Sequence, residues 1–259
     1  MRKIHPTAIV SEKARLGERV EVGPYTVIGD DVSIGDGTVI GAHCVIEKGT
    51  ALGKRCQVFT GAILGSIPQD LKYKGKATFL EIGDENIIRE YVTINPGTEE
   101  NSKTKVGSYN LIMAYSHIAH NCLIGNNCII ANAGTLAGYV TIEDKAVVGG
   151  LAAIHQFTRV GRLAIIGGCS KVVSDIPPYS TCDGHPARVY GLNLVGLRRQ
   201  GVDSKVIKQL SRAFKILFNS GLSLRHALEK LSEENYTSEE VSHLIEFIKG
   251  SKRGICRHH

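Results

Sequence analysis

Aliphatic residues recur at every sixth position over most of the chain. The series begins at Ile4 and runs without interruption to Leu64, and it returns in the same phase from Ile82 to Val172. Six residues are enough for one short strand and one tight corner, and a fixed period of this kind is typical of solenoids. The pattern therefore predicts a mainly β fold, a parallel β-helix built from hexapeptide repeats.

A second column of residues supports this fold. A small or β-branched residue usually stands two positions before each aliphatic one, and residues two apart on a strand point to the same face, so both columns should face the interior. Four cysteines in this column are interpreted as buried structural residues: Cys44, Cys56, Cys122 and Cys128. If three hexads make one coil of about 18 residues, the repeats form roughly nine to ten coils.

The repeat is interrupted twice and then ends. The breaks near 66–78 and 96–105 predict loops, which solenoids often place on their binding face. After the repeats, Asp203 and Ser223 can cap helices, and Thr237 with Glu240 can form a capping box before another. We therefore expect a β-helix domain over 1–191 and a small all-α domain over 192–259.

Composition and charge exclude several classes of protein. The net charge is +6, but no basic run with interleaved aromatic residues appears, so nucleic acid is not expected as a partner. The sequence contains no apolar stretch of about 18 residues, so no membrane span is expected. The seven cysteines lack metal-finger spacing. They are interpreted as free thiols, which favours a cytoplasmic location.

The chain from Val106 to Ile142 contains no Lys, Arg, Asp or Glu. We interpret this uncharged stretch as a subunit interface that contains a site; the alternative is a neutral, solvated wall. His120 lies within it near a corner and is a candidate general base, because the reference pKa of an imidazole is about 6.5. His155 follows an inward position two coils later and should point outward. A polar corner histidine without catalytic role is the alternative for His120.

Other catalytic signatures are missing from the sequence. It has no nucleophile elbow, phosphate-binding loop or dinucleotide fingerprint. A zinc site made by His117, His120 and His155 is conceivable, because β-helical carbonic anhydrases resemble this scaffold and use three histidines. We expect no metal and no cofactor.

Several short segments resemble one known family. They are QDLKY at 69–73, HIAHNC at 117–122, LAGYV at 136–140, AIHQF at 153–157, GGCS at 167–170 and DIPPYS at 175–180. Together they resemble the acyl-carrier-protein–UDP-N-acetylglucosamine O-acyltransferases, which begin lipid A biosynthesis. The resemblance implies a left-handed β-helix, a homotrimer and active sites between subunits. It also implies direct transfer of an R-3-hydroxyacyl chain from acyl carrier protein to the 3-position of the UDP-amino-sugar, without metal.

The same resemblance assigns roles to individual residues. It implies that His120 is the general base and that the backbone N–H of Gly138 binds the oxyanion. Residues that it places around the substrates are Asp70 and Lys72 for sugar and phosphate, His117, His155 and Gln156 along the cleft, Asn193 and Arg199 for the nucleotide, and Gly168 as the limit on acyl-chain length.

The sequence departs from the family pattern at five positions: Asn95, Asn121, Tyr139, Val195 and Gln200. Asn121 matters most, because an Asp commonly follows the base and Asn can only hydrogen-bond. A weaker base would suit a 3-amino acceptor, so the 3-amino analogue of the sugar stays open as the substrate. The other open alternatives are a hexapeptide acyltransferase that uses acetyl-CoA or a later lipid A intermediate, and a non-catalytic scaffold.

Overall fold

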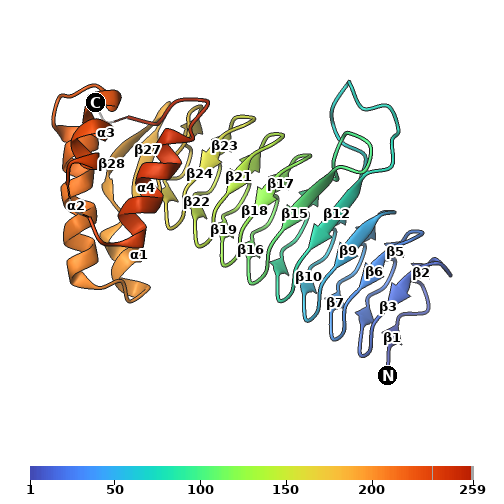
Figure 1. Cartoon of the computed structure of the whole chain (residues 1–259). Helices are drawn as coiled ribbons and strands as arrows, with labels where there is room; N and C mark the ends of the chain where they lie inside the picture. The colour runs from blue at the N-terminus through green and yellow to red at the C-terminus, as the bar shows by residue number, and fades with distance from the viewer. Residues whose placement is uncertain (235, 258–259) are drawn as a thin grey trace.

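The repeats form a parallel β-helix, as the sequence predicts. The structure, a computed structural model, describes residues 1–234 and 236–257. The coils stack from the N-terminus toward four helices that lie at the far end (Figure 1). Most hexads contribute a strand of two residues, and each strand pairs in parallel with the equivalent strand of the next coil.

Three sheets form the sides of the solenoid. Sheet A contains β1 (Lys3–Ile4), β4 (Glu21–Val22), β7 (Val39–Ile40), β10 (Gln57–Val58), β13 (Ile87–Ile88), β16 (Leu111–Ile112), β19 (Ile129–Ile130), β22 (Val147–Val148), β25 (Ile165–Ile166), β27 (Ser180–Gly184) and β28 (Ala187–Leu192). Sheet B contains β2 (Ile9–Val10), β5 (Val27–Ile28), β8 (Val45–Ile46), β11 (Ile63–Leu64), β14 (Thr93–Ile94), β17 (His117–Ile118), β20 (Thr135–Leu136), β23 (Ala153–Ile154) and β26 (Lys171–Val172). Sheet C contains β3 (Arg15–Leu16), β6 (Ser33–Ile34), β9 (Thr50–Leu52), β12 (Phe79–Ile82), β15 (Lys103–Val106), β18 (Leu123–Ile124), β21 (Thr141–Ile142) and β24 (Arg159–Val160).

The core follows the two predicted columns. The aliphatic residues of the sixfold repeat are buried from Leu16 onward, and the four cysteines of the small column are buried beside them. Ile4 is 44% exposed because the first coil has no coil beneath it. The core is therefore a narrow stack of small and medium aliphatic side chains, which agrees with an aromatic content of only 6%.

Left-handed backbone residues turn the chain at the corners. Asn121 and Tyr139, at the corner between sheets B and C, have φ of 59° and 60°. Many other corner residues share this conformation, including Tyr25 and His43 at the corner between sheets A and B. It is thus a requirement of the coil geometry rather than strain specific to one site.

Both interruptions of the repeat leave the solenoid at the corner between sheets B and C. The first runs from the end of β11 to the start of β12, and the second from the end of β14 to the start of β15. Figure 1 shows the two loops side by side above the coils. The second loop is shorter than the break in the pattern, because strand β15 already begins at Lys103.

The last part of the chain is a β-hairpin followed by helices. Strands β27 and β28 pair antiparallel and lead into α1 (Leu194–Arg199), α2 (Ser204–Asn219), α3 (Leu224–Ser232) and α4 (Glu239–Lys249). Ser223 caps α3 as predicted, and Asp203, one of the two residues expected before the preceding helix, caps α2. The predicted N-cap of α4, Thr237, is wrong by one residue. Ser238 is the N-cap, and its side chain accepts the Val241 N–H. The domain boundary at 191/192 stays a prediction.

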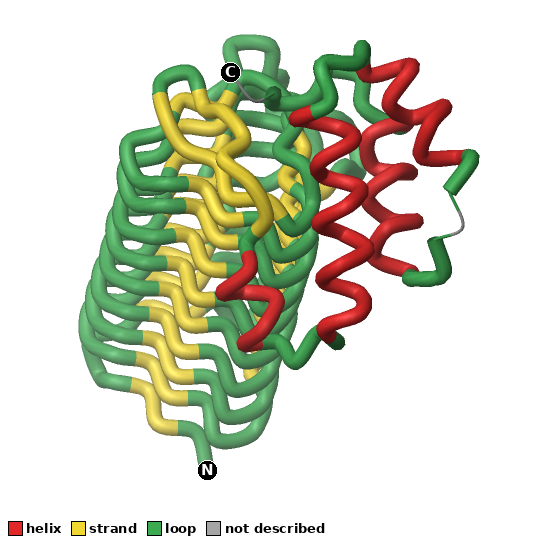
Figure 2. The backbone as a smooth tube through the Cα atoms, turned by 90° about the vertical axis from the view of Figure 1, so that its left-hand side faces the viewer, coloured by secondary structure: helices red, strands yellow, loops and turns green. Residues whose placement is uncertain are grey.

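The helices pack beside the final coils (Figure 2). His243 of α4 joins them to the solenoid, since its Nε2 lies 3.0 Å from Glu143 Oε2 and its Nδ1 lies 2.9 Å from the Tyr179 hydroxyl. Arg159 adds a cation–π contact, with its guanidinium 4.1 Å from the centre of the Phe247 ring. Within the described ranges, no helix is long and apolar enough to cross a membrane.

Candidate active site

His120 lies where strand β17 turns into the corner between sheets B and C. Its side chain is 14% exposed, and its ring rests on the backbone of Gly138 in the next coil. A Cβ atom on Gly138 would stand only 2.6 Å from His120 Nε2, well inside van der Waals contact. Glycine at 138 is therefore what allows the imidazole to occupy this place.

The backbone N–H of Gly138 is available to a ligand. Its neighbour Tyr139 donates its own N–H to the His120 carbonyl oxygen, and Gly138 accepts from the Phe157 N–H. Among the described residues, the Gly138 N–H itself donates to no other group. An imidazole thus contacts a residue whose backbone N–H is unused among the described residues, and acyl transfer can employ such a pair as a base and an oxyanion donor.

Asp70 of the first loop faces His120. One carboxylate oxygen, Oδ1, accepts the backbone N–H of Lys72 at 2.9 Å, and this short turn directs the other oxygen toward the imidazole. Asp70 Oδ2 lies 3.9 Å from His120 Nε2. The Lys72 side chain is exposed on the same turn. The first loop therefore brings a carboxylate close to the His120 imidazole, and it keeps a lysine nearby.

The Nδ1 edge of the His120 ring meets Asn121, which in turn contacts two residues that the sequence pattern did not indicate, Thr98 and Glu99. His120 Nδ1 lies 2.9 Å from Asn121 Oδ1, which also accepts the Thr98 hydroxyl at 2.9 Å. Asn121 Nδ2 donates to Glu99 Oε2 at 3.1 Å. The only signal in the sequence was the break at 96–105, because neither Thr98 nor Glu99 belongs to a repeat.

Tyr139 completes this network. Its hydroxyl donates to Glu99 Oε1, and its ring meets the His120 ring edge-on with centres 5.4 Å apart. The hydrogen bond from Tyr139 lowers the pKa of Glu99 from its usual value, while burial and then the Glu99 carboxylate raise the pKa of Tyr139. Glu99 is thus an ionised acceptor at neutral pH. The departures at Asn121 and Tyr139 are linked through this one carboxylate.

His117 and Asn95 support the site from the neighbouring strands. His117 Nδ1 lies 2.7 Å from Thr93 Oγ1 on the outer face of sheet B, and burial, followed by the nearby His120, lowers the pKa of His117. His117 is therefore neutral at physiological pH. Asn95 is buried and donates to the Ser66 carbonyl at 3.0 Å, so it fixes the start of the first loop.

His155 and Gln156 lie at the same corner, in the coil beyond Gly138, and both are exposed. His155 Nδ1 lies 3.3 Å from the Gln156 carbonyl oxygen. In the part of the chain that the structure describes, no group of three or more His, Cys, Asp or Glu is placed to hold a metal ion. The three histidines considered for zinc are therefore not gathered into one ligand set.

Three other predicted residues lie outside the corner between sheets B and C. Gly168 is exposed at the corner between sheets A and B. Asn193 caps α1, since its Oδ1 accepts the Gly196 N–H and its Nδ2 donates to the Leu163 carbonyl, both at 2.9 Å. Arg199 is exposed at the end of that helix. One chain alone does not bring these residues to His120.

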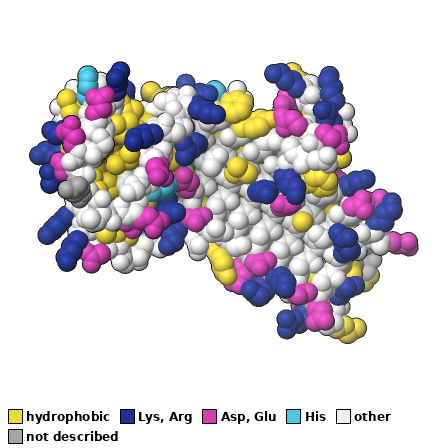
Figure 3. Space-filling model, viewed as in Figure 1, with side chains coloured by type: hydrophobic (Ala, Val, Ile, Leu, Met, Phe, Trp, Pro, Cys, Tyr) yellow, Lys and Arg dark blue, Asp and Glu magenta, His cyan; other side chains and the backbone are white. Residues whose placement is uncertain are grey.

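The surface around the middle coils carries few charges on the side drawn in Figure 3. On that side, charged side chains gather on the N-terminal coils, the long loops and the helices.

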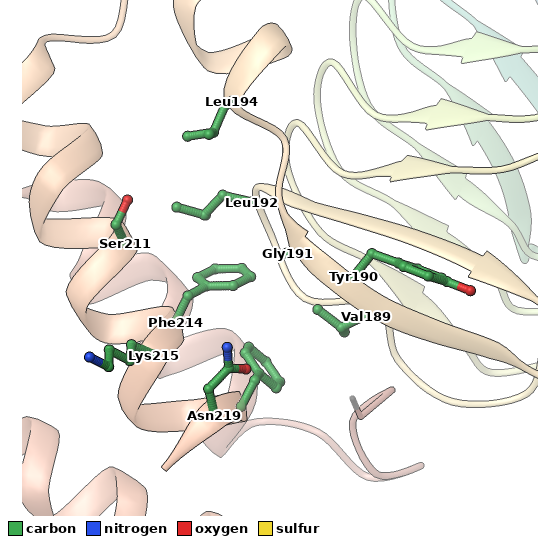
Figure 4. Close-up of a pocket in the computed structure, with 10 residues that line it drawn as sticks. Val189, Tyr190, Gly191, Leu192, Leu194, Ser211, Phe214, Lys215 and Asn219 are labelled. Carbon is green, nitrogen blue, oxygen red and sulfur yellow. The ribbon is translucent and has the colours of Figure 1, made fainter. Parts of the chain in front are cut away.

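A separate pocket of about 320 Å³ lies between β28 and α2. Leu192 and Phe214 face each other across it, and Tyr190 points away (Figure 4). None of the predicted site residues lines this pocket, so it is distinct from the candidate site.

Comparison with known proteins identifies the family. The acyl-[acyl-carrier-protein]–UDP-N-acetylglucosamine O-acyltransferase of Alkalilimnicola ehrlichii is 52% identical over 258 residues, which are 99% of this chain and 100% of the relative. The corresponding protein of Thiobacillus denitrificans is 48% identical with the same coverage. The chain belongs to the acyl-carrier-protein–UDP-N-acetylglucosamine O-acyltransferase family. It is accordingly an acyltransferase.

Solved structures of the O-acyltransferase family have the same fold. The UDP-N-acetylglucosamine acyltransferase of Campylobacter jejuni is 44% identical and superposes with a TM-score of 0.94, covering 99% of this chain and 100% of its own. That of Bacteroides fragilis is 42% identical with a TM-score of 0.96, covering 98% and 99%. The family model described as UDP N-acetylglucosamine O-acyltransferase, domain 2, matches residues 175–256, and the bacterial transferase hexapeptide model matches 13–48 and 103–137.

Proposed function

We propose that this protein transfers an R-3-hydroxyacyl chain from acyl carrier protein to the 3-hydroxyl group of UDP-N-acetylglucosamine, the first step of lipid A biosynthesis. The proposal rests chiefly on the contact between the His120 imidazole and Gly138, whose N–H donates to no described group. Family membership supplies the substrates, which are those in the names of the relatives. The cysteines of the chain are free thiols, which supports a location in the reducing cytoplasm.

The first step is attack of the sugar hydroxyl on the thioester. His120 Nε2 accepts the hydroxyl proton as the oxygen bonds to the carbonyl carbon, and the carbonyl oxygen becomes an oxyanion. The N–H of Gly138 donates to that oxyanion. A fixed donor of this kind contributes about 3 kcal/mol to transition-state stability. Asp70, 3.9 Å from Nε2, is placed to accept a hydrogen bond from the sugar as it enters.

The second step is collapse of the tetrahedral intermediate. The C–S bond breaks, the ester remains on the sugar, and the proton held on His120 passes to the departing sulfur. The imidazole is then neutral and ready for another cycle. No acyl-enzyme forms, and the arrangement of the site agrees with this: the buried thiol nearest in sequence, Cys122, has its pKa raised to about 12 by burial. Such a thiol is a poor nucleophile.

We also propose a homotrimer with each site between two subunits. The outward residues of sheet A form a half-buried apolar column from the middle of the solenoid toward its C-terminal end. They are Ile87, Leu111, Ile129, Val147 and Ile165. Such a column is an unusual outer face for a solenoid and is suited to a subunit contact. Because Gly168 lies at another corner than His120 and Arg199 lies at the end of α1, a neighbouring subunit would supply the nucleotide and acyl-chain contacts.

The reaction is tested by supplying defined donors and acceptors to the purified protein. We expect transfer from hydroxyacyl carrier proteins to UDP-N-acetylglucosamine, and little transfer from acetyl-CoA. The 3-amino analogue serves as the competing acceptor, since Asn121 raised that possibility. A strong preference for the 3-amino sugar would mean that the protein forms an amide rather than an ester. No transfer to either sugar would refute the proposed function.

Shared sites are tested by mixing two inactive variants. His120→Ala and Arg199→Ala subunits, refolded or co-expressed together, should regain activity, because some interfaces combine an intact His120 with an intact Arg199. In a cyclic trimer, random mixing restores roughly a quarter of the sites. Activity that stays at the level of the separate variants would mean that one subunit supplies both residues.

A further inference from the structure

The Asn121 amide can face His120 in two ways, and the two ways have opposite consequences. With its oxygen toward Nδ1, it accepts a hydrogen bond and requires the proton to be on Nδ1. With its NH₂ group toward Nδ1, it donates and moves the proton to Nε2. A neutral imidazole carries one proton, so only the first arrangement leaves Nε2 with a free lone pair to act as the base.

The contacts of Asn121 favour the first arrangement. The Thr98 hydroxyl donates to Oδ1, on the same side as His120 Nδ1. On the other side, Nδ2 donates to the Glu99 carboxylate, which is an acceptor only. Turning the amide over would set its oxygen against that carboxylate. Glu99 is therefore the residue that makes the two orientations unequal.

We propose that Glu99 is a positioning residue, which locks the Asn121 amide so that His120 carries its proton on Nδ1 and presents a free Nε2 beside Gly138. The consequence for turnover rests on the proposed function, whereas the tautomer itself does not. Tyr139 holds the Glu99 side chain in place by donating to Oε1.

Other ionisable groups near His120 do not fix the proton on Nδ1. Asp70 faces Nε2 at 3.9 Å, beyond hydrogen-bond distance. His117 is turned toward Thr93 through its own Nδ1. Tyr139 meets the His120 ring edge-on, and its hydroxyl is directed to Glu99. Only the Asn121 amide contacts Nδ1 among the described residues.

The tautomer is measured directly by nitrogen NMR on protein labelled at histidine, above the pH at which imidazoles titrate. The His120 signals are assigned as those lost in His120→Gln. We expect a protonated Nδ1 and an unprotonated Nε2 in the wild type, and a mixture of tautomers in Glu99→Gln, whose amide satisfies either orientation of Asn121. An unchanged tautomer in Glu99→Gln overturns the proposal, and no substrate is needed to see it.

Turnover provides the second measurement. Glu99→Gln should lower kcat about tenfold while KM changes little, as expected when a supporting partner of a functional imidazole is lost. Glu100→Gln removes the neighbouring, exposed carboxylate of the same loop and should leave kcat unchanged. Equal losses in the two variants would mean that loop charge, rather than the contact with Asn121, matters.

A compensating pair separates positioning from loop structure. In Glu99→Gln combined with Asn121→Asp, the new carboxylate accepts from Nδ1 with one oxygen and from the new amide with the other, so the proton is again fixed on Nδ1. We expect kcat to recover to within about threefold of the wild type, a strong non-additivity between contacting residues. A double variant no better than Glu99→Gln would contradict the proposal.

Discussion

The His120 ring covers the backbone of Gly138 so closely that a methyl group on Gly138 would lie 2.6 Å from His120 Nε2. The contact joins two coils, since the residues are separated by one turn of the solenoid, and it sets the proposed base beside the proposed donor without any flexible segment between them. Preorganisation of this kind is what makes electrostatic stabilisation effective in an enzyme. The rigid β-helix is thus part of the chemistry.

The first prediction concerns this contact. Gly138→Ala should lower kcat by about 100-fold or more, because the new methyl group displaces the imidazole from the donor. Circular dichroism and the melting temperature should change little, since the corner backbone of Gly138 has no positive φ. Gly150→Ala is the matched control: its added Cβ would meet only the Asn132 carbonyl oxygen, at 3.3 Å. Similar kcat values for the two variants would contradict the account.

The second prediction concerns the length of the acyl chain. A Cβ on Gly168 would meet only the Gly150 carbonyl oxygen, at 3.3 Å, so a longer side chain fits at this exposed position. If Gly168 limits the groove, Gly168→Met should shift the preferred donor to a shorter hydroxyacyl chain. Relative kcat/KM for a series of hydroxyacyl carrier proteins measures the shift. An unchanged preference would place the end of the groove elsewhere.

The third prediction concerns the attachment of the helices. Burial alone would raise the pKa of Glu143. The hydrogen bond and charge of His243, then the backbone N–H of Arg162 and the charge of Arg159, outweigh burial and hold that pKa below its ordinary value of 4.5. The carboxylate therefore stabilises the fold above about pH 4.5, and this stabilisation is lost as the pH falls through the lower folded pKa.

Urea unfolding at several pH values tests this contribution. Glu143→Gln should lower the free energy of unfolding by about 2 kcal/mol near neutral pH, as expected when a buried hydrogen-bonding partner is replaced. The difference from the wild type should shrink in acid. Glu229→Gln, which breaks the exposed pair with Arg225, should change stability by less than about 0.5 kcal/mol. A pH-independent difference for Glu143→Gln would rule out the ionised carboxylate as its source.

The fourth prediction concerns the cysteines. Cys169 is exposed, whereas the other six are buried, and burial raises the pKa of Cys128 to about 11. A thiol reagent should therefore modify Cys169 rapidly in the native protein and the others only after denaturation. Mass spectrometry of the labelled protein, with Cys169→Ser as the control, checks this. Rapid labelling of Cys122 or Cys128 would contradict the predicted core.

Most of the fold was predictable because the repeat itself encodes it. Ile118 and Cys122 are buried for the same reason as their equivalents in every other coil, so the period identifies them without knowledge of the family. The capping box failed at Thr237, because Ser238, Glu239 and Glu240 offer an equally good start one residue later, and Thr237 instead contacts Gln209.

The site was only partly predictable, for a different reason. His120 stands out in an uncharged stretch, but Glu99 lies in a loop where no period indicates which way a side chain points. Asn193 shows the opposite difficulty, since its side chain already caps α1 through Oδ1 and donates to the Leu163 carbonyl through Nδ2. Its contact with a nucleotide stays a prediction. Contacts across corners and between subunits depend on tertiary placement, which a residue pattern does not contain.

The most direct test of the central claim is the turnover of His120→Ala with both substrates saturating. We expect kcat to fall by about 10²–10⁴-fold, as for loss of a general base, while the melting temperature and oligomeric state stay unchanged. A His120→Ala protein that is correctly assembled and still transfers the acyl chain within threefold of the wild-type kcat would contradict it.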